Sequence, residues 1–431
     1  MSKKHIFVVG LDEFNREKLE NLPQAADYEF HPALDYQDIQ SGRQLDMKKL
    51  INRAVTRIGS AGVPVDGIVS FYDFPGTLLV PVVAGFFGVR SPALEHVLKC
   101  EHKYWSRSEQ QKSIPDHIPQ FFPFDPFDED VPVKIPIPFP YWIKPVKSFL
   151  SVLAYLINNE KDYLKVIPVI QEKAGYFDEP FNHILELSGM RADTRQNFIA
   201  ESLLSGKMCT AEGYVFKGEV TVYGMIDSVR EEGRSSFSRY EYPSSVPREV
   251  QERIADIARR AITGIGLDNS AFNIEFFWDQ DHDHIWLLEV NPRISQSHAD
   301  LFEKVHGSSH HSVMLDIAMD QEPRLPEKNG MFRMAAKFML RVFEDGIVTG
   351  VPGTGKLRQI SRELPGTVVK SAVKPGDRLS ELPFQDSYSY LLASVFIGGD
   401  DQSDLLDKYK RCRTLLDFKI RREDPYPVQA I

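Results

Sequence analysis

The most constraining feature of the sequence is residues 271–290, which read as two apolar segments joined by a short polar turn at Asp279–Asp283. Apolar runs of this length, interrupted by a turn of acidic and polar residues, are typical of a β-hairpin. Side chains of a strand alternate between its two faces, so Glu289, Asn291 and Arg293 share one face. The sequence therefore predicts a hairpin that presents a carboxylate, an amide and a guanidinium in a row.

The first strand of this hairpin carries a further carboxylate, Glu275. If Glu275 and Glu289 point to one face, two carboxylates and the Asn291 amide converge, and such hard oxygen ligands suit Mg²⁺. The alternative is a solvent-facing polar stripe in which Arg293 pairs with a carboxylate. The residues of the hairpin leave both interpretations open.

Composition excludes several classes of protein. A chain of 431 residues with 42% hydrophobic and 26% charged residues is expected to fold into two to four globular domains. The net charge of −10 and the absence of a long Lys/Arg block argue against nucleic-acid binding. No apolar run approaches the length of a signal peptide or a transmembrane helix, and the three cysteines are widely spaced, so we expect a cytoplasmic protein with no membrane partner.

The N-terminal region alternates predicted strands and helices, which is typical of an open parallel sheet. The predicted strands are 5–9, 28–31 and 67–70, and the predicted helices are 14–22, 47–58 and 78–87. A proline-rich stretch follows at 113–145 and excludes a long helix there. Further helices are predicted at 151–158, 248–265 and 403–416, and the region after residue 326 is expected to be β-rich.

Two lysines and a serine-containing loop lie upstream of the hairpin. Lys103 is placed at a predicted helix start, and Lys144 ends the strand-like PYWIKP. The loop that follows contains Ser148 and Ser151, whose backbone N–H groups are suited to phosphate, although Ser151 is equally suited to capping a helix. Solvated lysines remain the alternative for both cations.

The segment Glu201–Leu204 follows a predicted strand and precedes a turn. It could present backbone groups to an adenine edge, or it could be part of an ordinary β-hairpin. GVPGTGK at 350–356 is interpreted as a glycine-rich β-turn, because Leu357 stands where a phosphate-binding P-loop has Ser or Thr.

The order of these features resembles the ATP-grasp superfamily, with LLEVNPR as the most specific motif. The resemblance implies an α/β (α+β) chain: a pre-ATP-grasp open parallel sheet at 1–96, a two-subdomain ATP-grasp fold at 97–326 and a β-rich C-terminal region at 327–431. A central lid subdomain is implied at about 140–200.

The resemblance also implies roles for individual residues and an activity. Lys103, Lys144, Ser148, Ser151, Glu201 and Leu204 would bind ATP; Glu275, Glu289 and Asn291 would hold Mg²⁺, or Mn²⁺; Arg293 and Glu289 would be catalytic. The implied enzyme is a carboxylate-amine ligase that forms an acyl phosphate and couples it to an amine. Its partners would be a small-molecule carboxylate and amine, and a homodimer is expected from base rates.

Two departures keep alternatives open. The loop at 147–151 contains no glycine, where the family's phosphate loop is often glycine-rich, and this is the only support for a non-catalytic nucleotide-binding protein. A biotin-carboxylase-like enzyme is the other alternative. Gln296, Ser297 and His298 stand where that subgroup's glutamate base is expected, and the chain has no biotin-attachment segment.

Overall fold

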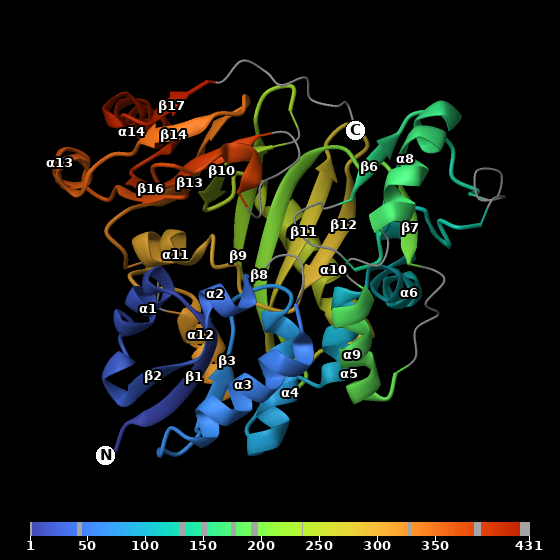
Figure 1. Cartoon of the computed structure of the whole chain (residues 1–431), viewed down its shortest axis with the longest axis horizontal. Helices are drawn as coiled ribbons and strands as arrows, with labels where there is room; N and C mark the ends of the chain where they lie inside the picture. The colour runs from blue at the N-terminus through green and yellow to red at the C-terminus, as the bar shows by residue number, and fades with distance from the viewer. Residues whose placement is uncertain are drawn as a thin grey trace. The chain divides into compact units, whose positions relative to one another are not determined.

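The computed structural model describes residues 2–40, 45–128, 135–147, 153–173, 178–190, 197–234, 236–325, 329–382 and 389–422. The chain forms two compact units (Figure 1). Unit 1 contains Met1–Gly224, Val246–Gln296 and His310–Leu325, and unit 2 contains Met225–Ser245, Ser297–Ser309 and Pro326–Ile431. The expected mixture of a parallel sheet with antiparallel sheets is confirmed. The domain boundaries at 96 and 326 remain a prediction.

Unit 1 begins with the predicted parallel sheet, whose strand order is β2-β1-β3 (Figure 1). Its strands are β1 (Lys4–Leu11), β2 (Tyr28–Asp35) and β3 (Gly67–Val69), and its helices are α1 (Glu13–Glu20), α2 (Tyr36–Ile39), α3 (Met47–Gly59) and α4 (Gly76–Phe87). One face of β1, carrying Ile6 and Val8, packs with Leu19 in a buried apolar cluster. Asp46 caps α3 by accepting a hydrogen bond from the Lys49 backbone at 2.9 Å, as a short polar side chain at this position should.

A smaller antiparallel sheet in unit 1 has the order β4-β7-β5-β6. It contains β4 (Phe121–Phe124), β5 (Tyr141–Pro145), β6 (Tyr155–Ile157) and β7 (Phe198–Ser202), with helices α8 (Glu160–Lys173) and α9 (Asp178–Ser188). The helix predicted at 151–158 is wrong where the structure describes this segment, because Tyr155–Ile157 pairs with β5. A short apolar run does not reveal its period, and here the neighbouring strand decided the conformation.

The remaining strands of unit 1 are β8 (Lys207–Phe216), the first part of β9 (Glu219–Arg230), β11 (Ser270–Asp279) and β12 (His284–Asn291). Its remaining helices are α5 (Leu94–Glu101), α6 (Lys103–Ser113), α10 (Arg248–Ile265) and α12 (His311–Ala318). The predicted helix at 248–265 is confirmed to the residue, and it ends at Gly266, whose φ of +80° suits a residue without a side chain.

Unit 2 contains the end of β9, and the strands that follow β9 in the sheet have the order β10-β13-β16-β15. Its elements are β10 (Phe237–Tyr242), α11 (Ala299–His306), β13 (Met334–Val342), β14 (Ile347–Gly350), α13 (Thr354–Glu363), β15 (Val368–Ser371), β16 (Tyr390–Gly399), α14 (Gln402–Leu415) and β17 (Lys419–Arg421). The β-rich character and the closing helix near 403–416 are confirmed. The interpretation of 350–356 as a plain turn is wrong, because α13 begins at Thr354 behind an extended Gly353.

Within the described part of the chain, no helix has both the length and the apolar character needed to cross a membrane.

Candidate functional site

The predicted hairpin is formed by β11 and β12, with a turn between Asp279 and His284. In the antiparallel register Glu275 lies opposite Glu289, and Asn273 lies opposite Asn291. Residues directly opposite each other in antiparallel strands point to the same face. The two carboxylates and two amides therefore occupy one face of the hairpin, as the alternation of the sequence predicted for Glu289 and Asn291.

Arg293 lies just past the end of β12 and binds a carboxylate from the N-terminal sheet region of the same unit. Its Nη2 atom donates to Asp73 Oδ2 at 2.9 Å and to Asn291 Oδ1 at 3.3 Å. Burial raises the pKa of the Asp73 carboxyl, but Arg293 and then Lys147 outweigh it and hold the pKa at about 2. Asp73 is therefore a counter-ion that keeps the guanidinium fixed beside Asn291.

Lys103 is the first residue of α6, as predicted, and its Nζ lies 3.2 Å from Glu289 Oε1. Burial lowers the pKa of the Lys103 amine, but the Glu289 carboxylate more than compensates, so the pKa is raised. Burial raises the pKa of Glu289, but the opposing effect of Lys103 and then Lys144 is larger. The net pKa is therefore lowered, and Glu289 is ionised. The helix start thus places a cation against the predicted metal-binding carboxylate.

Lys144 and Glu201 lie on the adjacent strands β5 and β7 of the smaller sheet. Lys144 Nζ is 2.5 Å from Glu201 Oε2, and Arg107 Nε on α6 donates to Glu201 Oε1 at 2.7 Å. Burial raises the pKa of Glu201, but Arg107 and Lys144 hold it at about 2. Arg107 also donates to the carbonyl groups of Leu287 at 3.2 Å and Leu288 at 2.6 Å, so it links α6, β7 and β12.

A second buried ion pair joins Lys147 and Glu101. Lys147 Nζ contacts Glu101 Oε2, Thr77 Oγ1 donates to Glu101 Oε1 at 2.8 Å, and the Lys147 ammonium lies 4.7 Å from the centre of the Phe74 ring. Burial raises the pKa of Glu101 even though Lys147 opposes this shift. Lys147 is thereby held immediately before Ser148 in the sequence.

Glu212 on β8 supports the hairpin from the neighbouring strand. Its Oε1 atom accepts from Asn273 Nδ2 at 2.7 Å and from the Ser295 backbone at 3.3 Å, and its Oε2 lies 3.8 Å from His310 Nδ1. The Asn291 amide in turn donates to Asn273 Oδ1 at 3.5 Å. This chain of contacts orients the amide face beside Arg293.

The structure brings six of the sequence-predicted residues into three contacting pairs: Lys103 with Glu289, Asn291 with Arg293, and Lys144 with Glu201. Glu275 lies opposite Glu289 in the register, and Leu204 follows the end of β7. Ser148 and Ser151 lie outside the described residues, so the phosphate loop remains a prediction.

Sequence reasoning missed Asp73, Glu101, Arg107, Lys147 and Glu212. Arg107 follows Lys103 by four residues, which places both on one side of α6, and this spacing could have identified it. Glu212 and Thr210 are two residues apart on β8, so their side chains share one face. This is the same period-2 signal that identified Glu289. No local signal marks Asp73, because its partner is 220 residues away.

Residues 137–299 match the family model described as an ATP-grasp domain. The chain contains an ATP-grasp domain. This match includes most of the residues just described, from Lys144 to Arg293. A search among proteins with curated descriptions gave no match.

Solved structures share the fold of nearly the whole chain. The L-amino acid ligase from Bacillus licheniformis has a TM-score of 0.70 at 15% identity, covering 98% of this chain and 100% of that one. The N5-carboxyaminoimidazole ribonucleotide synthetase from Thermotoga maritima has a TM-score of 0.64 at 14% identity, covering 96% and 99%. The biotin carboxylase from Campylobacter jejuni has a TM-score of 0.62 at 14% identity, covering 97% and 92%. At such identities the likeness concerns the fold.

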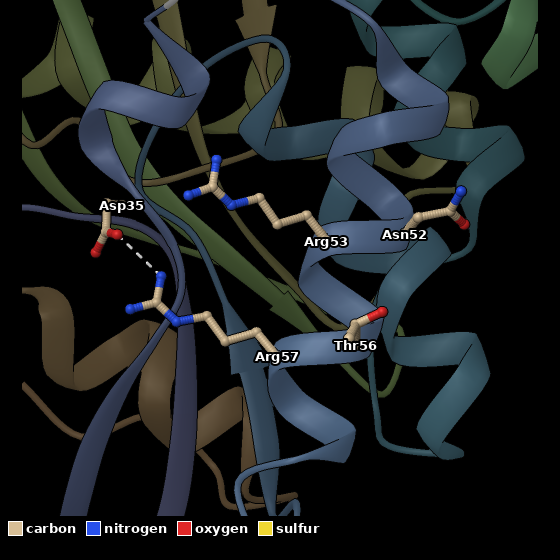
Figure 2. Close-up of a pocket in the computed structure, with 5 residues that line it drawn as sticks. All are labelled: Asp35, Asn52, Arg53, Thr56 and Arg57. Atoms are coloured by element: carbon tan, nitrogen blue, oxygen red, sulfur yellow. Dashed lines mark hydrogen bonds and ion pairs between the residues drawn. The ribbon is translucent and has the colours of Figure 1, made fainter.

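A surface hollow of about 510 Å³ lies apart from these ATP-grasp residues, along α3 (Figure 2). It is lined by Asp35, Asn52, Arg53, Thr56 and Arg57. Arg57 is held by Asp35 at 2.9 Å, and Arg53 pairs with Asp38 at 2.7 Å. None of the sequence-predicted site residues lines this hollow, and both arginines already have carboxylate partners, so it provides no argument for the site.

Proposed function

We propose that the protein is an ATP-dependent carboxylate-amine ligase that releases ADP and phosphate. The observation that supports this most strongly is the shared face of the β11–β12 hairpin, where Glu275 and Glu289 lie opposite each other and Asn291 contacts Arg293. A nucleotide-binding module without catalysis has no need for carboxylates, an amide and a phosphate-matching guanidinium in one array.

Glu275, Glu289 and Asn291 are the proposed ligands of Mg²⁺. Their oxygen atoms fit this hard cation, which is bound in proteins by a few carboxylates together with substrate phosphates. A bound Mg²⁺ would neutralise charge on the nucleotide phosphates. Mn²⁺ is the expected substitute because it favours the same type of ligand.

The cations of the site are the proposed phosphate ligands. Lys103 contacts Glu289 and Lys144 contacts Glu201, so each ammonium group is held by a carboxylate. We further propose that the backbone at Ser148 and Ser151 contacts the phosphates. Glu201 and Leu204 would lie at the adenine edge, where the Glu201 side chain positions Lys144 and the backbone meets the base.

Arg293 is the proposed catalytic cation. An oxygen of the substrate carboxylate bonds to the γ-phosphorus of ATP while the bond from that phosphorus to the β–γ bridging oxygen breaks, which leaves ADP and an acyl phosphate. The amine then attacks the acyl carbon, phosphate leaves and the amine loses a proton. Arg293 stabilises the transferred phosphoryl group, because its planar fork matches phosphate oxygens and Asp73 fixes its position.

Amino acids are the proposed substrates and a peptide-like amide is the proposed product. The fold likeness to an L-amino acid ligase supports this substrate class, and the bicarbonate reaction is the second candidate because a biotin carboxylase shares the fold. Gln296, Ser297 and His298, however, supply no glutamate base after Arg293. The carboxylate-amine reaction therefore accounts better for the residues of this chain.

The deciding experiment measures ADP and phosphate release with Mg-ATP against a grid of amino acids and small carboxylates, added singly and in pairs. We expect release to require a pair and mass spectrometry to find a product one water lighter than the sum of that pair. Stimulation by bicarbonate alone would replace the proposal with the carboxylase reaction. ATP binding without stimulated release by any substrate would contradict catalysis.

A further inference from the structure

A group of metal-ligating side chains lies on the N-terminal parallel sheet, away from the proposed nucleotide site. It consists of His5 on β1 and of Glu29 and His31 on β2. In the parallel register His5 lies beside Glu29, and Phe7 lies beside His31, so the three side chains emerge on one face of neighbouring strands. Figure 1 shows β1 and β2 side by side in blue.

The ligand atoms of this group already lie near one point. His5 Nδ1 is 3.0 Å from His31 Nε2, and Glu29 oxygens are 3.8 Å from each of these nitrogens. The ligands of a tetrahedral zinc ion lie about 3.3 Å apart, because Zn–N and Zn–O bonds are roughly 2.0–2.2 Å long. The observed distances bracket this value. Small side-chain rotations that move the ligand atoms by a few tenths of an ångström would equalise the distances.

The surroundings also suit a metal site. The His5 and His31 side chains are 16% and 23% exposed, whereas Glu29 is 54% exposed, so the imidazoles are held by packing and the carboxylate faces solvent. The His31 ring stacks on Phe7 with centroids 5.0 Å apart, and the backbone N–H of His5 donates to Asp66 Oδ2 at 2.9 Å. The His31 ring is therefore held by packing, and the His5 backbone is anchored to Asp66.

We propose that His5, His31 and Glu29 form a binding site for a zinc-class divalent ion that clamps the edge strand β2 to β1. Two imidazoles and one carboxylate are the ligands that zinc accepts with a further position left for water. Binding replaces the hydrogen bond between the two rings: the shared proton moves to the other nitrogen of its own imidazole, and both facing lone pairs bind the ion. Among the described residues, these three side chains form the one group in which at least three His, Cys, Asp or Glu ligand atoms all lie within 4.8 Å of one another.

The test measures Zn²⁺ binding to the full-length protein by competition with a chromophoric chelator, in the presence of excess Mg²⁺ and without nucleotide. We expect one Zn²⁺ per chain, with visible absorption bands of four-coordinate Co²⁺ when cobalt replaces zinc. His31→Gln and His5→Gln should each weaken that binding by more than about 100-fold, beyond the 10–100-fold that loss of an outer-shell partner typically costs.

A matched control comes from His282 at the exposed tip of the hairpin. It pairs with Asp279 at 2.9 Å and does not belong to the group of His5, Glu29 and His31. His282→Gln should retain the Zn²⁺ stoichiometry and the Co²⁺ bands. Zn²⁺ should also raise the melting temperature of the wild-type protein and of the His282 variant but not of the His31 variant. Equal Zn²⁺ binding by wild type and His31→Gln, or no binding by wild type, would overturn the proposal.

Discussion

Lys103 and Glu289 form an ion pair across 3.2 Å, although one is the proposed phosphate ligand and the other the proposed metal ligand. The same arrangement recurs at Lys144 with Glu201 and at Arg293 with Asp73. Each of these three cations is thus held by a carboxylate. Such pairing avoids the cost of leaving a charge uncompensated in a partly buried site.

Glu289→Gln should abolish ADP release while the protein stays folded. The substitution removes a proposed metal ligand and the charge that Lys103 contacts, so we expect turnover to fall by at least about 100-fold, the scale on which one electrostatic contact in an active site acts. The measurement is substrate-stimulated ADP release, with circular dichroism as the check of folding. Asp283→Asn on the exposed tip of the same hairpin should leave release unchanged. A Glu289 variant as active as wild type would refute the proposed metal site.

Arg293→Lys should lower kcat by roughly 100-fold with a smaller effect on KM for ATP, because a lysine keeps the charge but cannot reproduce the planar fork. Steady-state kinetics with the substrate pair found in the grid would measure both constants. Arg253, which binds Asp283 through both carboxylate oxygens at 2.8 Å on the surface, offers the matched control Arg253→Lys. A change in KM alone would assign Arg293 to ground-state binding instead.

Glu201→Gln should lower the free energy of unfolding by about 3–5 kcal/mol, the usual effect of removing one partner from a buried ion pair. Glu201 is 5% exposed and Arg107 is 3% exposed, so the substitution leaves a buried guanidinium facing a neutral amide. Urea unfolding measures the difference. Glu252→Gln, in an exposed helical pair with Arg248, should change stability by less than about 0.5 kcal/mol. Equal effects of the two variants would contradict this account.

Lys337 in unit 2 should make stability rise with pH between about 7 and 10. Burial lowers the pKa of its amine to about 7, and Lys370 and Arg341 add to the shift. An unfolded lysine titrates near 10.5, so in this window the unfolded chain binds more protons than the folded chain, and raising the pH favours folding.

The measurement for Lys337 is chemical denaturation from pH 6.5 to 10 in wild type and in Lys337→Met. Loss of the rise in the variant would confirm its origin, since methionine does not titrate. Lys410→Met, at an exposed position of α14, should keep the wild-type slope. Parallel curves for wild type and the Lys337 variant would show that another group causes the dependence.

The hairpin and its polar face could be predicted from sequence because both strands are adjacent in the chain and their period of two fixes which side chains share a face. Lys103 and Lys144 could be placed because a helix start and a strand end have local signatures. Their partners could not, since Arg107 meets Glu201 across 94 residues and Asp73 meets Arg293 across 220. The error at 155–157 has the same cause, because pairing with β5 rather than local periodicity set the conformation.

The alternation of chain segments between the two compact units has a consequence for synthesis. Unit 1 needs residues 310–325 to complete it, and these follow two excursions of the chain into unit 2. On the ribosome, β1, β2 and β3 emerge early, but the buried cluster that they share with Val313 and Leu315 cannot close until α12 has left the exit tunnel. The nascent protein must therefore carry an unfinished apolar surface through most of its elongation, and chaperone dependence should concentrate in that interval.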